Sequence, residues 1–250
     1  MEARRVLLMA MMTTTLTTTS RAYAYRPFDS TDASVATTGD LEFELGPVGY
    51  YRARERNFLV APSLIVNYGF APRWEMVLQG RDFILLDDVP GEPRARLIDT
   101  GFFLKGVLRE GSLQGRSGPS VGTEVGVLLP TVNGESGVGV TGIVIVSQRW
   151  DAATLHVNGA VSLTRAGNAD FFGGVILEGP HSWVVRPVAE VFVDHEVSAD
   201  TAISGLVGAI WRASDSLSFD AAFRAAYVAG SPVYEGRLGL TWAIPIVRSP

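Results

Sequence analysis

One glycine-rich motif in this chain has the spacing of a nucleotide-binding turn. Gly137, Gly139 and Gly142 fit the pattern G-x-G-x-x-G, in which a strand leads into a helix whose N-terminus holds a pyrophosphate. The β-branched run at 143–146 that follows is typical of a strand, so the helix that this chemistry needs is missing. We therefore expect no cofactor here, and we interpret the glycines as the point where a loop re-enters a strand.

The three histidines are the candidates for ester hydrolysis, which needs a serine, a histidine within hydrogen-bond reach and an orienting polar group. His156 shares one face of a predicted strand with Asn158 and Ser162, whereas His181 lies in a short turn and His195 at a strand end. A lipase acting on bilayer lipid would need its nucleophile on the apolar, lipid-facing side. We therefore predict no catalytic residue and no enzyme, and a lipid-modifying enzyme stays open as an alternative.

Acidic residues offer two candidate metal sites. The Asp-His-Glu run at 194–196 lies on a predicted strand, where adjacent side chains point to opposite faces and cannot converge on one ion. Asp87, Asp88 and Glu92 form an acidic loop that could attract divalent cations, but a solvated loop explains it as well. We predict no metal site.

The elements that would position these residues are strands, because polar and apolar residues alternate at period two in about a dozen runs of roughly ten residues. In the run 154–164, Leu155, Val157 and Val161 share one face, and His156 and Asn158 share the other. This pattern predicts an all-β fold, a transmembrane antiparallel up-and-down β-barrel of about 12 strands over residues 41–244. The expected strands are 41–51, 58–70, 74–85, 97–109, 120–129, 141–150, 154–164, 171–178, 183–194, 202–212, 217–227 and 234–243.

Connections between these strands alternate in length, as in outer-membrane barrels with tight periplasmic turns and longer outer loops. The connection 110–119 is an exception, because it is long but falls on the side of the tight turns. The short turns are 71–73, 151–153, 179–182 and 214–216, and the long connections are 52–57, 86–96 and 130–140.

Aromatic residues separate a membrane barrel from a soluble barrel or sandwich, which has the same alternation with its apolar face inward. All tryptophans fall at strand ends that the predicted topology places on one side, as an aromatic girdle at the headgroup level requires. The girdle residues are Trp74, Trp150, Trp183, Trp211 and Trp242. The opposite belt is expected to hold Tyr51, Phe58, Phe83, Tyr227 and Tyr234.

The first residues, 1–24, have the composition of a secretory signal peptide. Arg4 and Arg5 precede a short apolar stretch, and Ala22-Tyr23-Ala24 provides a small-x-small cleavage site. Its removal would change the formal net charge from −5 to −7, so a nucleic-acid partner is not expected. Residues 25–40 would then form an N-terminal segment on the periplasmic side or in the lumen, and 245–250 a C-terminal tail.

Ionisable residues of both signs recur on the polar faces of nearly all the predicted strands. Inside a barrel they could attract solutes, select them by charge, or close the bore by pairing with one another. The candidates for lining the lumen and contacting solute are Glu42, Glu44, Glu75, Arg81, Lys105, Arg109, Glu124, Arg186, Glu190, Asp220, Arg224, Glu235 and Arg237.

Several short motifs, in order, resemble a bacterial outer-membrane family of transporters of the "MetA-pathway of phenol degradation" type. They are Arg26-Pro27-Phe28-Asp29-Ser30-Thr31-Asp32-Ala33, Thr38-Gly39-Asp40, Tyr68-Gly69-Phe70, Gly126 to Thr131 and Leu238 to Trp242. The chain departs from that family at Thr31-Asp32, where an Asp pair is common. It also departs after Trp242, where members end in an aromatic residue. The resemblance implies an outer-membrane barrel and suggests uptake of small, aromatic or hydrophobic compounds.

These observations predict a monomeric protein of the outer membrane that passes or binds small solutes without covalent chemistry. Its expected partners are outer-membrane lipid and lipopolysaccharide, a small-molecule solute, and the barrel-assembly machinery. A plugged structural or adhesive barrel is the alternative, because paired lumen charges could also fill the bore.

Overall fold

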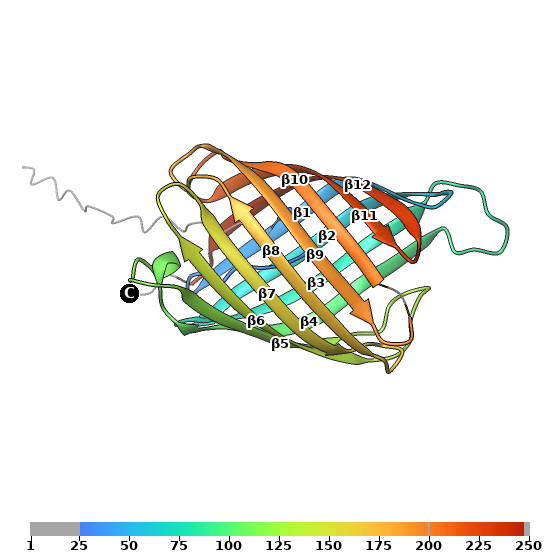
Figure 1. Ribbon diagram of the computed structural model, residues 1–250, viewed down its shortest axis with the longest axis horizontal. Coiled ribbons are helices and arrows are strands. Elements are labelled where there is room, and N and C mark those ends of the chain that lie inside the picture. Colours follow the sequence, from blue (N-terminus) through green and yellow to red (C-terminus); the bar gives the residue numbers. More distant parts are fainter. Residues whose placement is uncertain (1–25, 200, 248–250) are drawn as a thin grey trace, which may run out of the picture.

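The computed structural model describes residues 26–199 and 201–247, and the predicted signal peptide lies outside the described residues. Each strand pairs antiparallel with the next along the chain, and β12 pairs with β1 to close a barrel (Figure 1). The expected all-β antiparallel barrel is therefore confirmed. The strands are β1 (Asp40–Ala53), β2 (Arg56–Ala71), β3 (Trp74–Leu85), β4 (Ala95–Arg109), β5 (Ser120–Leu128), β6 (Gly139–Arg149), β7 (Thr154–Leu163), β8 (Ala169–Glu178), β9 (Val185–Glu196), β10 (Thr201–Arg212), β11 (Leu217–Val228) and β12 (Ser231–Pro245).

The bounds of the predicted strands differ from those observed by at most three residues. Strand β7 shows why the alternation located them so well. His156 is 1% exposed and Asn158 is 4% exposed, whereas Val157 and Val161 are 43% and 58% exposed. The two chemical classes along the sequence are therefore the two faces of the barrel wall.

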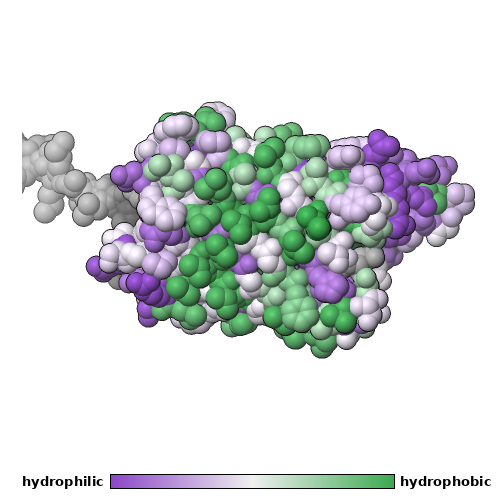
Figure 2. All heavy atoms as spheres, in the orientation of Figure 1, coloured by the Kyte–Doolittle hydropathy of each residue, from purple (hydrophilic) through white to green (hydrophobic). Residues whose placement is uncertain are grey.

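The outer surface of the barrel is apolar around its middle. Large hydrophobic side chains point outward from the strands; Val191 of β9 and Val207 of β10 are both more than half exposed. Figure 2 shows this apolar surface in green between polar, purple ends. No helix in the two described ranges is long and apolar enough to cross a membrane.

The two ends of the barrel differ in their connections. We call the end with connections 72–73, 150–153, 179–184 and 213–216 the turn end, and the opposite end, from which loop 86–94 projects, the loop end (Figure 1). The connection at 52–57, predicted to be long, is instead a tight hairpin. Strand β1 continues to Ala53 and β2 begins at Arg56, so only Arg54, at φ 55°, and Glu55 form the turn.

The connection 110–119 is long and lies at the turn end, and the structure gives a reason for its length. It contains the 3-10 helix η1 (Ser112–Gln114), whose Leu113 packs with Ala33 and Ile145 in a small apolar core. The Gln114 side-chain amide donates a hydrogen bond of 2.8 Å to the carbonyl of Ala33. This connection therefore covers part of the turn end and holds the N-terminal segment in place.

Candidate functional site: the barrel lumen and its N-terminal segment

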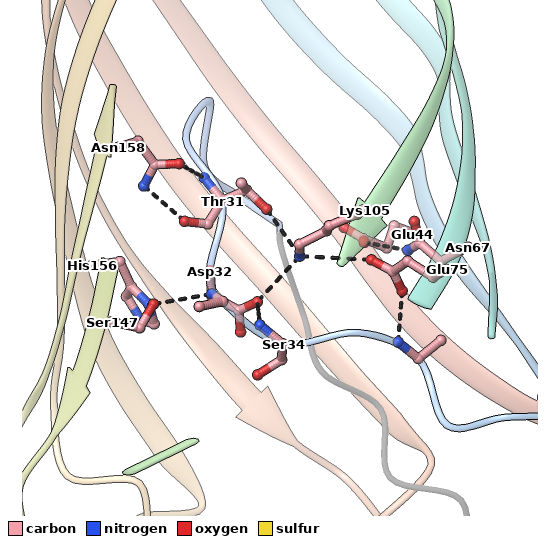
Figure 3. Close-up of polar contacts among 12 residues, drawn as sticks. Thr31, Asp32, Ser34, Glu44, Asn67, Glu75, Lys105, Ser147, His156 and Asn158 are labelled. Atoms are coloured by element: carbon pink, nitrogen blue, oxygen red, sulfur yellow. Dashed lines mark hydrogen bonds and ion pairs between the residues drawn. The ribbon is translucent and has the colours of Figure 1, made fainter. Parts of the chain in front are cut away.

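The lumen is occupied by the chain's own N-terminal segment. Residues 26–39, which we call the lumen segment, precede β1 and contact the inner face of the wall on several strands (Figures 1 and 3). At the turn end, Thr38 bridges to Gly69 of β2, and the Gly39 amide donates to the Gly69 carbonyl at 2.7 Å. A side chain at Gly69 would contact the backbone carbonyls of Ala36 and Thr37, so this approach requires glycine.

Lumen side chains accept hydrogen bonds from several backbone amides of the lumen segment, whose one bridge to a strand is at Thr38. Glu190 of β9 accepts two of these bonds, from the amides of Asp29 at 2.9 Å and of Ser30 at 2.6 Å. Asn158 of β7 accepts from the Thr31 amide at 3.0 Å and donates to the Thr31 carbonyl at 2.8 Å. Because each of these buried polar groups finds a partner, the wall specifies this path of the segment.

The same pattern continues toward the turn end. The amide of Ala33 donates to Ser147 Oγ of β6 at 3.0 Å, and that of Ala36 to Glu75 Oε2 of β3 at 2.6 Å. At the start of the segment, the Arg26 amide donates to Glu44 of β1 at 3.1 Å. These hydrogen bonds thus reach strands on different sides of the barrel, so the lumen segment crosses the bore.

Lys105 of β4 links the segment to the wall by charge. Its Nζ lies 3.4 Å from Asp32 of the segment, 3.6 Å from Glu75 and 3.5 Å from the hydroxyl of Thr31 (Figure 3). The side chain of Lys105 is 1% exposed, and a buried ammonium group is stable only with such partners. This contact anchors the middle of the segment to the wall.

A second charged cluster surrounds Asp29, nearer the loop end. Arg237 of β12 lies with Nη2 3.0 and 2.9 Å from the two carboxylate oxygens, and Arg81 and Arg224 approach the same carboxylate at 3.5 and 4.0 Å. Glu235 accepts bonds of 2.8 Å from both Arg224 and Arg237. Three guanidinium groups therefore converge on the carboxylate of one segment residue.

A backbone irregularity brings Asp99 to this cluster. The register of β3 and β4 shifts between Gln79 and Arg81, and Asp99 of β4 has a left-handed φ of 53° at this bulge. The Asp99 carboxylate lies 3.2 Å from Arg81 Nε. Bulges redirect side chains in this way, and a non-glycine residue at positive φ marks a position that its surroundings must hold.

A cavity of about 170 Å³ lies beside the Arg cluster, between the segment and the wall. It is lined by charged groups, among them Arg81 and Arg237, and by the apolar side chains of Phe28, Val60 and Val77. The Arg81 side chain is 31% exposed, so there is room for water beside it in this part of the lumen.

An aromatic cluster lies further toward the loop end. The rings of Tyr51, Phe58 and Phe83 form mutual edge contacts, with centroids 5.2 to 5.9 Å apart. Phe83 follows Arg81 by two residues on β3, so it lies on the same inner face of the wall. The prediction that these three residues join an outer aromatic belt is wrong. In β1 the register shifts between Leu45 and Val48, which turns Tyr50 outward and Tyr51 inward.

Ser147, His156 and Glu178 form a hydrogen-bonded chain across β6, β7 and β8. The distances are 2.8 Å from Ser147 Oγ to His156 Nδ1 and 2.9 Å from His156 Nε2 to Glu178. These residue types could activate a serine. However, Ser147 is fully buried and already accepts the Ala33 amide, so an ester has no access to its oxygen. These three hydrogen-bonded residues therefore anchor the lumen segment.

Twelve of the thirteen predicted lumen residues have side chains on the inner face. Arg109 is the exception, because it lies at the last ladder position of β4, after a register shift at Val107, where the wall ends. It is exposed and donates a bond of 2.9 Å to the Pro119 carbonyl. The residues on the inner face are Glu42, Glu44, Glu75, Arg81, Lys105, Glu124, Arg186, Glu190, Asp220, Arg224, Glu235 and Arg237.

The other sequence candidates lie outside this site. His195 is exposed and bonds Thr201 at 2.8 Å, while Asp194 and Glu196 take the opposite face of β9. No group of three or more potential ligands for a metal ion occurs in the described part of the chain. The glycine motif at 137–142 leads directly into strand β6.

All five tryptophans lie at the turn end with exposed side chains, from 37% at Trp74 to 54% at Trp150 and Trp183. Trp211 stacks on Phe219 with ring centroids 5.4 Å apart. Tyr227 and Tyr234 are exposed at the loop end. The structure thus gives the outer wall an aromatic rim at each end.

The sequence left open whether residues 25–40 lie in the lumen, and it did not identify Asp29 and Arg26 as partners of the wall. Asp29 and Arg26 belong to no alternating run, and their partners are distant in the chain. The polar composition of residues 26–40, with few apolar positions to bury, was the one signal in the sequence for a position in the polar lumen.

Comparison with known proteins defines the class of fold. No protein-family model matches this chain, and no curated protein is similar to it in sequence. The COG4313 outer membrane channel from Pseudomonas putida F1 has a TM-score of 0.64 at 9% identity, over 87% of this chain and 100% of that one. The KdgM porin, in a complex with disordered oligogalacturonate, has a TM-score of 0.52 at 9% identity, over 81% and 98% of the two chains. The chain therefore has the closed-barrel fold of outer-membrane channels and porins.

Proposed function

We propose that this protein is an outer-membrane channel that passes small solutes, aromatic or hydrophobic ones among them, without covalent chemistry. The observation that carries this proposal is a closed barrel with an apolar outside and a charged inside that encloses a cavity lined by charged and apolar groups. A soluble barrel would bury its apolar face and expose the charges. The fold that it shares with channels and porins agrees with this function.

The location in the outer membrane follows from the same surface. Hydrocarbon would cover the apolar band, while the exposed tryptophans at the turn end would lie at the headgroup level as a girdle. The proposed route is export through the signal peptide, insertion by the barrel-assembly machinery, and a monomer surrounded by lipid and lipopolysaccharide. We also propose that the chain belongs to the transporter family that its motifs resemble.

Aromatic side chains line the lumen between the loop end and the cavity, and this lining suits aromatic solutes. Tyr51, Phe58 and Phe83 form an apolar wall that leads toward the cavity, where Phe28 and Val60 continue it. Aromatic rings stack well on such surfaces. The resemblance to a phenol-degradation family suggests the same solute class.

A sealed structural barrel is the second candidate, and the bonds of the lumen segment favour it. Glu190, Asn158 and Ser147 hold the lumen segment across the bore. Solutes can therefore pass only if this segment shifts or leaves a narrow path beside it. The two candidates differ in conductance, because a sealed barrel passes neither ions nor solutes.

The test is planar-bilayer recording and liposome uptake with the purified full chain. We expect small, fluctuating conductance and uptake of glycerol and phenol but not of dextran. The variant Glu190→Ala, which loses two bonds to the segment, should conduct more than the wild type. Absence of conductance and uptake in both proteins, with heat-modifiable migration showing that both are folded, would overturn the proposal and leave the sealed barrel.

A further inference from the structure

The carboxylate of Asp29 occupies a site built by the barrel wall. Arg81, Arg224 and Arg237 come from three strands, β3, β11 and β12, and all three guanidinium groups approach this carboxylate. Arg237 is 7% exposed and Arg224 is 12% exposed at the side chain, so the positive charges are removed from bulk water. Planar guanidinium groups are the preferred partners of carboxylates in such positions.

Among the groups in direct contact, the charges balance only while Asp29 is in place. The wall contributes three arginines and two acids, Glu235 and Asp99, that contact them. Asp29 is the third acid and belongs to the segment, which is the part of the site not built into the wall. Withdrawal of its carboxylate leaves the cluster with one uncompensated positive charge, a strong attraction for another anion.

We propose that Arg81, Arg224 and Arg237 form a binding site for the carboxylate of a small aromatic acid, and that Asp29 fills this site until the solute displaces it. The proposal deepens the function proposed above and rests on it for passage through the bore. Binding itself does not require conduction.

The surroundings of the site suit an aromatic acid. The cavity of about 170 Å³ adjoins Arg81 and Arg237, and cavities of about 150 Å³ are large enough for one benzene ring. Phe28, Val60 and Val77 supply apolar contacts in this cavity, and Phe83 adds a ring two residues beyond Arg81. A solute would therefore place its carboxylate on the arginines and its ring against these side chains.

Competition with Asp29 would keep the affinity low, which suits a channel. A tethered carboxylate has a high effective concentration at its site, so a free acid must displace it at a cost in apparent affinity. A conducting site must bind well enough to admit the solute and weakly enough to release it. The Asp29 and Ser30 amides bonded to Glu190 can hold the segment while the Asp29 carboxylate turns away.

Titration calorimetry with benzoate on the full-length protein in detergent tests the proposal. We expect Asp29→Asn to bind benzoate about tenfold more tightly than the wild type, because the internal competitor has lost its charge. Asp88→Asn is the matched control, since it removes the same charge from the exposed loop 86–94, outside the lumen, and should leave benzoate binding unchanged. Benzyl alcohol, a neutral analogue, should bind at least tenfold more weakly than benzoate to Asp29→Asn.

Two results would overturn the inference. One is equal affinity of wild type and Asp29→Asn for benzoate, and the other is equal binding of benzoate and benzyl alcohol. If Asp29→Asn does not fold, Arg224→Gln is compared with the wild type instead. Loss of one guanidinium should weaken the binding of benzoate at least tenfold and leave the binding of benzyl alcohol unchanged. An unchanged benzoate affinity in that variant would also contradict the site.

Neutral-solute flux separates this inference from the function. Uptake of glycerol without selective benzoate binding would leave the channel and remove the carboxylate site. Benzoate binding without any flux would keep the site and remove the channel.

Discussion

The carboxylate of Asp29 and the guanidinium of Arg237 are in contact although 208 residues separate them in the sequence, with Nη2 3.0 and 2.9 Å from the two oxygens. Asp29 precedes the first strand, and Arg237 lies in the last. The contact forms because β12 pairs with β1 and the segment before β1 turns back into the bore. Closure of the barrel and docking of the segment are therefore linked in one site.

Glu190 should be the strongest single anchor of the lumen segment. In Glu190→Ala the amides of Asp29 and Ser30 lose their acceptor, and a hydrogen bond to a charged group contributes about 1.5–3 kcal/mol. We expect a several-fold rise in mean single-channel conductance. Glu196→Gln, an acid at the rim of the same strand, is the control and should conduct like the wild type. Equal conductance of all three proteins would show that the segment does not limit the current.

Gly69 should be essential for the entry of the segment at the turn end. In Gly69→Ala the new methyl group would meet the carbonyl of Thr37, and such overpacking costs about 1–3 kcal/mol. We expect a lower urea midpoint of unfolding and a higher conductance. Gly159→Ala is the matched control, because a side chain there meets open space. Identical midpoints for the two variants would contradict this close approach.

His181, in the turn between β8 and β9, should make stability depend on pH. Burial and the charges of Arg149, Arg186 and Arg212 lower the pKa of His181 to about 4. Its Nδ1 lies 3.2 Å from Arg186 Nη1, a contact that the neutral ring can accept. In the unfolded chain, His181 takes up a proton near the ordinary histidine pKa of about 6.5. The free energy of unfolding therefore falls as the pH drops from about 6.5 toward 4.

Urea unfolding in detergent at pH 7.5 and at pH 5 measures this effect. The loss of stability at pH 5 should be smaller in His181→Gln than in the wild type. His195→Gln, a histidine at the loop end, should behave as the wild type does. An unchanged pH dependence in His181→Gln would assign the effect to other groups.

Ser147 should act as an anchor and not as a nucleophile. Its Oγ accepts the Ala33 amide in a fully buried position, which leaves no space for an ester carbonyl. We expect the wild type and Ser147→Ala to hydrolyse a micellar nitrophenyl ester at the same background rate, while Ser147→Ala has the lower unfolding midpoint. Hydrolysis by the wild type that is lost in Ser147→Ala and in His156→Gln would instead support the enzyme alternative.

The alternating pattern predicted most of the wall but failed where strands are irregular. Twelve of the thirteen lumen candidates face inward because period two applies to each regular strand. Tyr51 was assigned to the wrong face, because the register shift in β1 follows Leu45 and cannot be seen in the alternation. Arg109 was misplaced for a related reason, since nothing local to β4 indicates where the wall ends.

By itself, the sequence determined the barrel, because lipid and lumen impose their opposite preferences on neighbouring residues of each strand. That is a local requirement, repeated along the chain. Only the tertiary structure decided that residues 26–39 lie in the lumen and that Asp29 meets Arg81, Arg224 and Arg237. Those contacts depend on which side chains closure of the barrel places around the same point of the bore, and short-range periodicity carries no information about that.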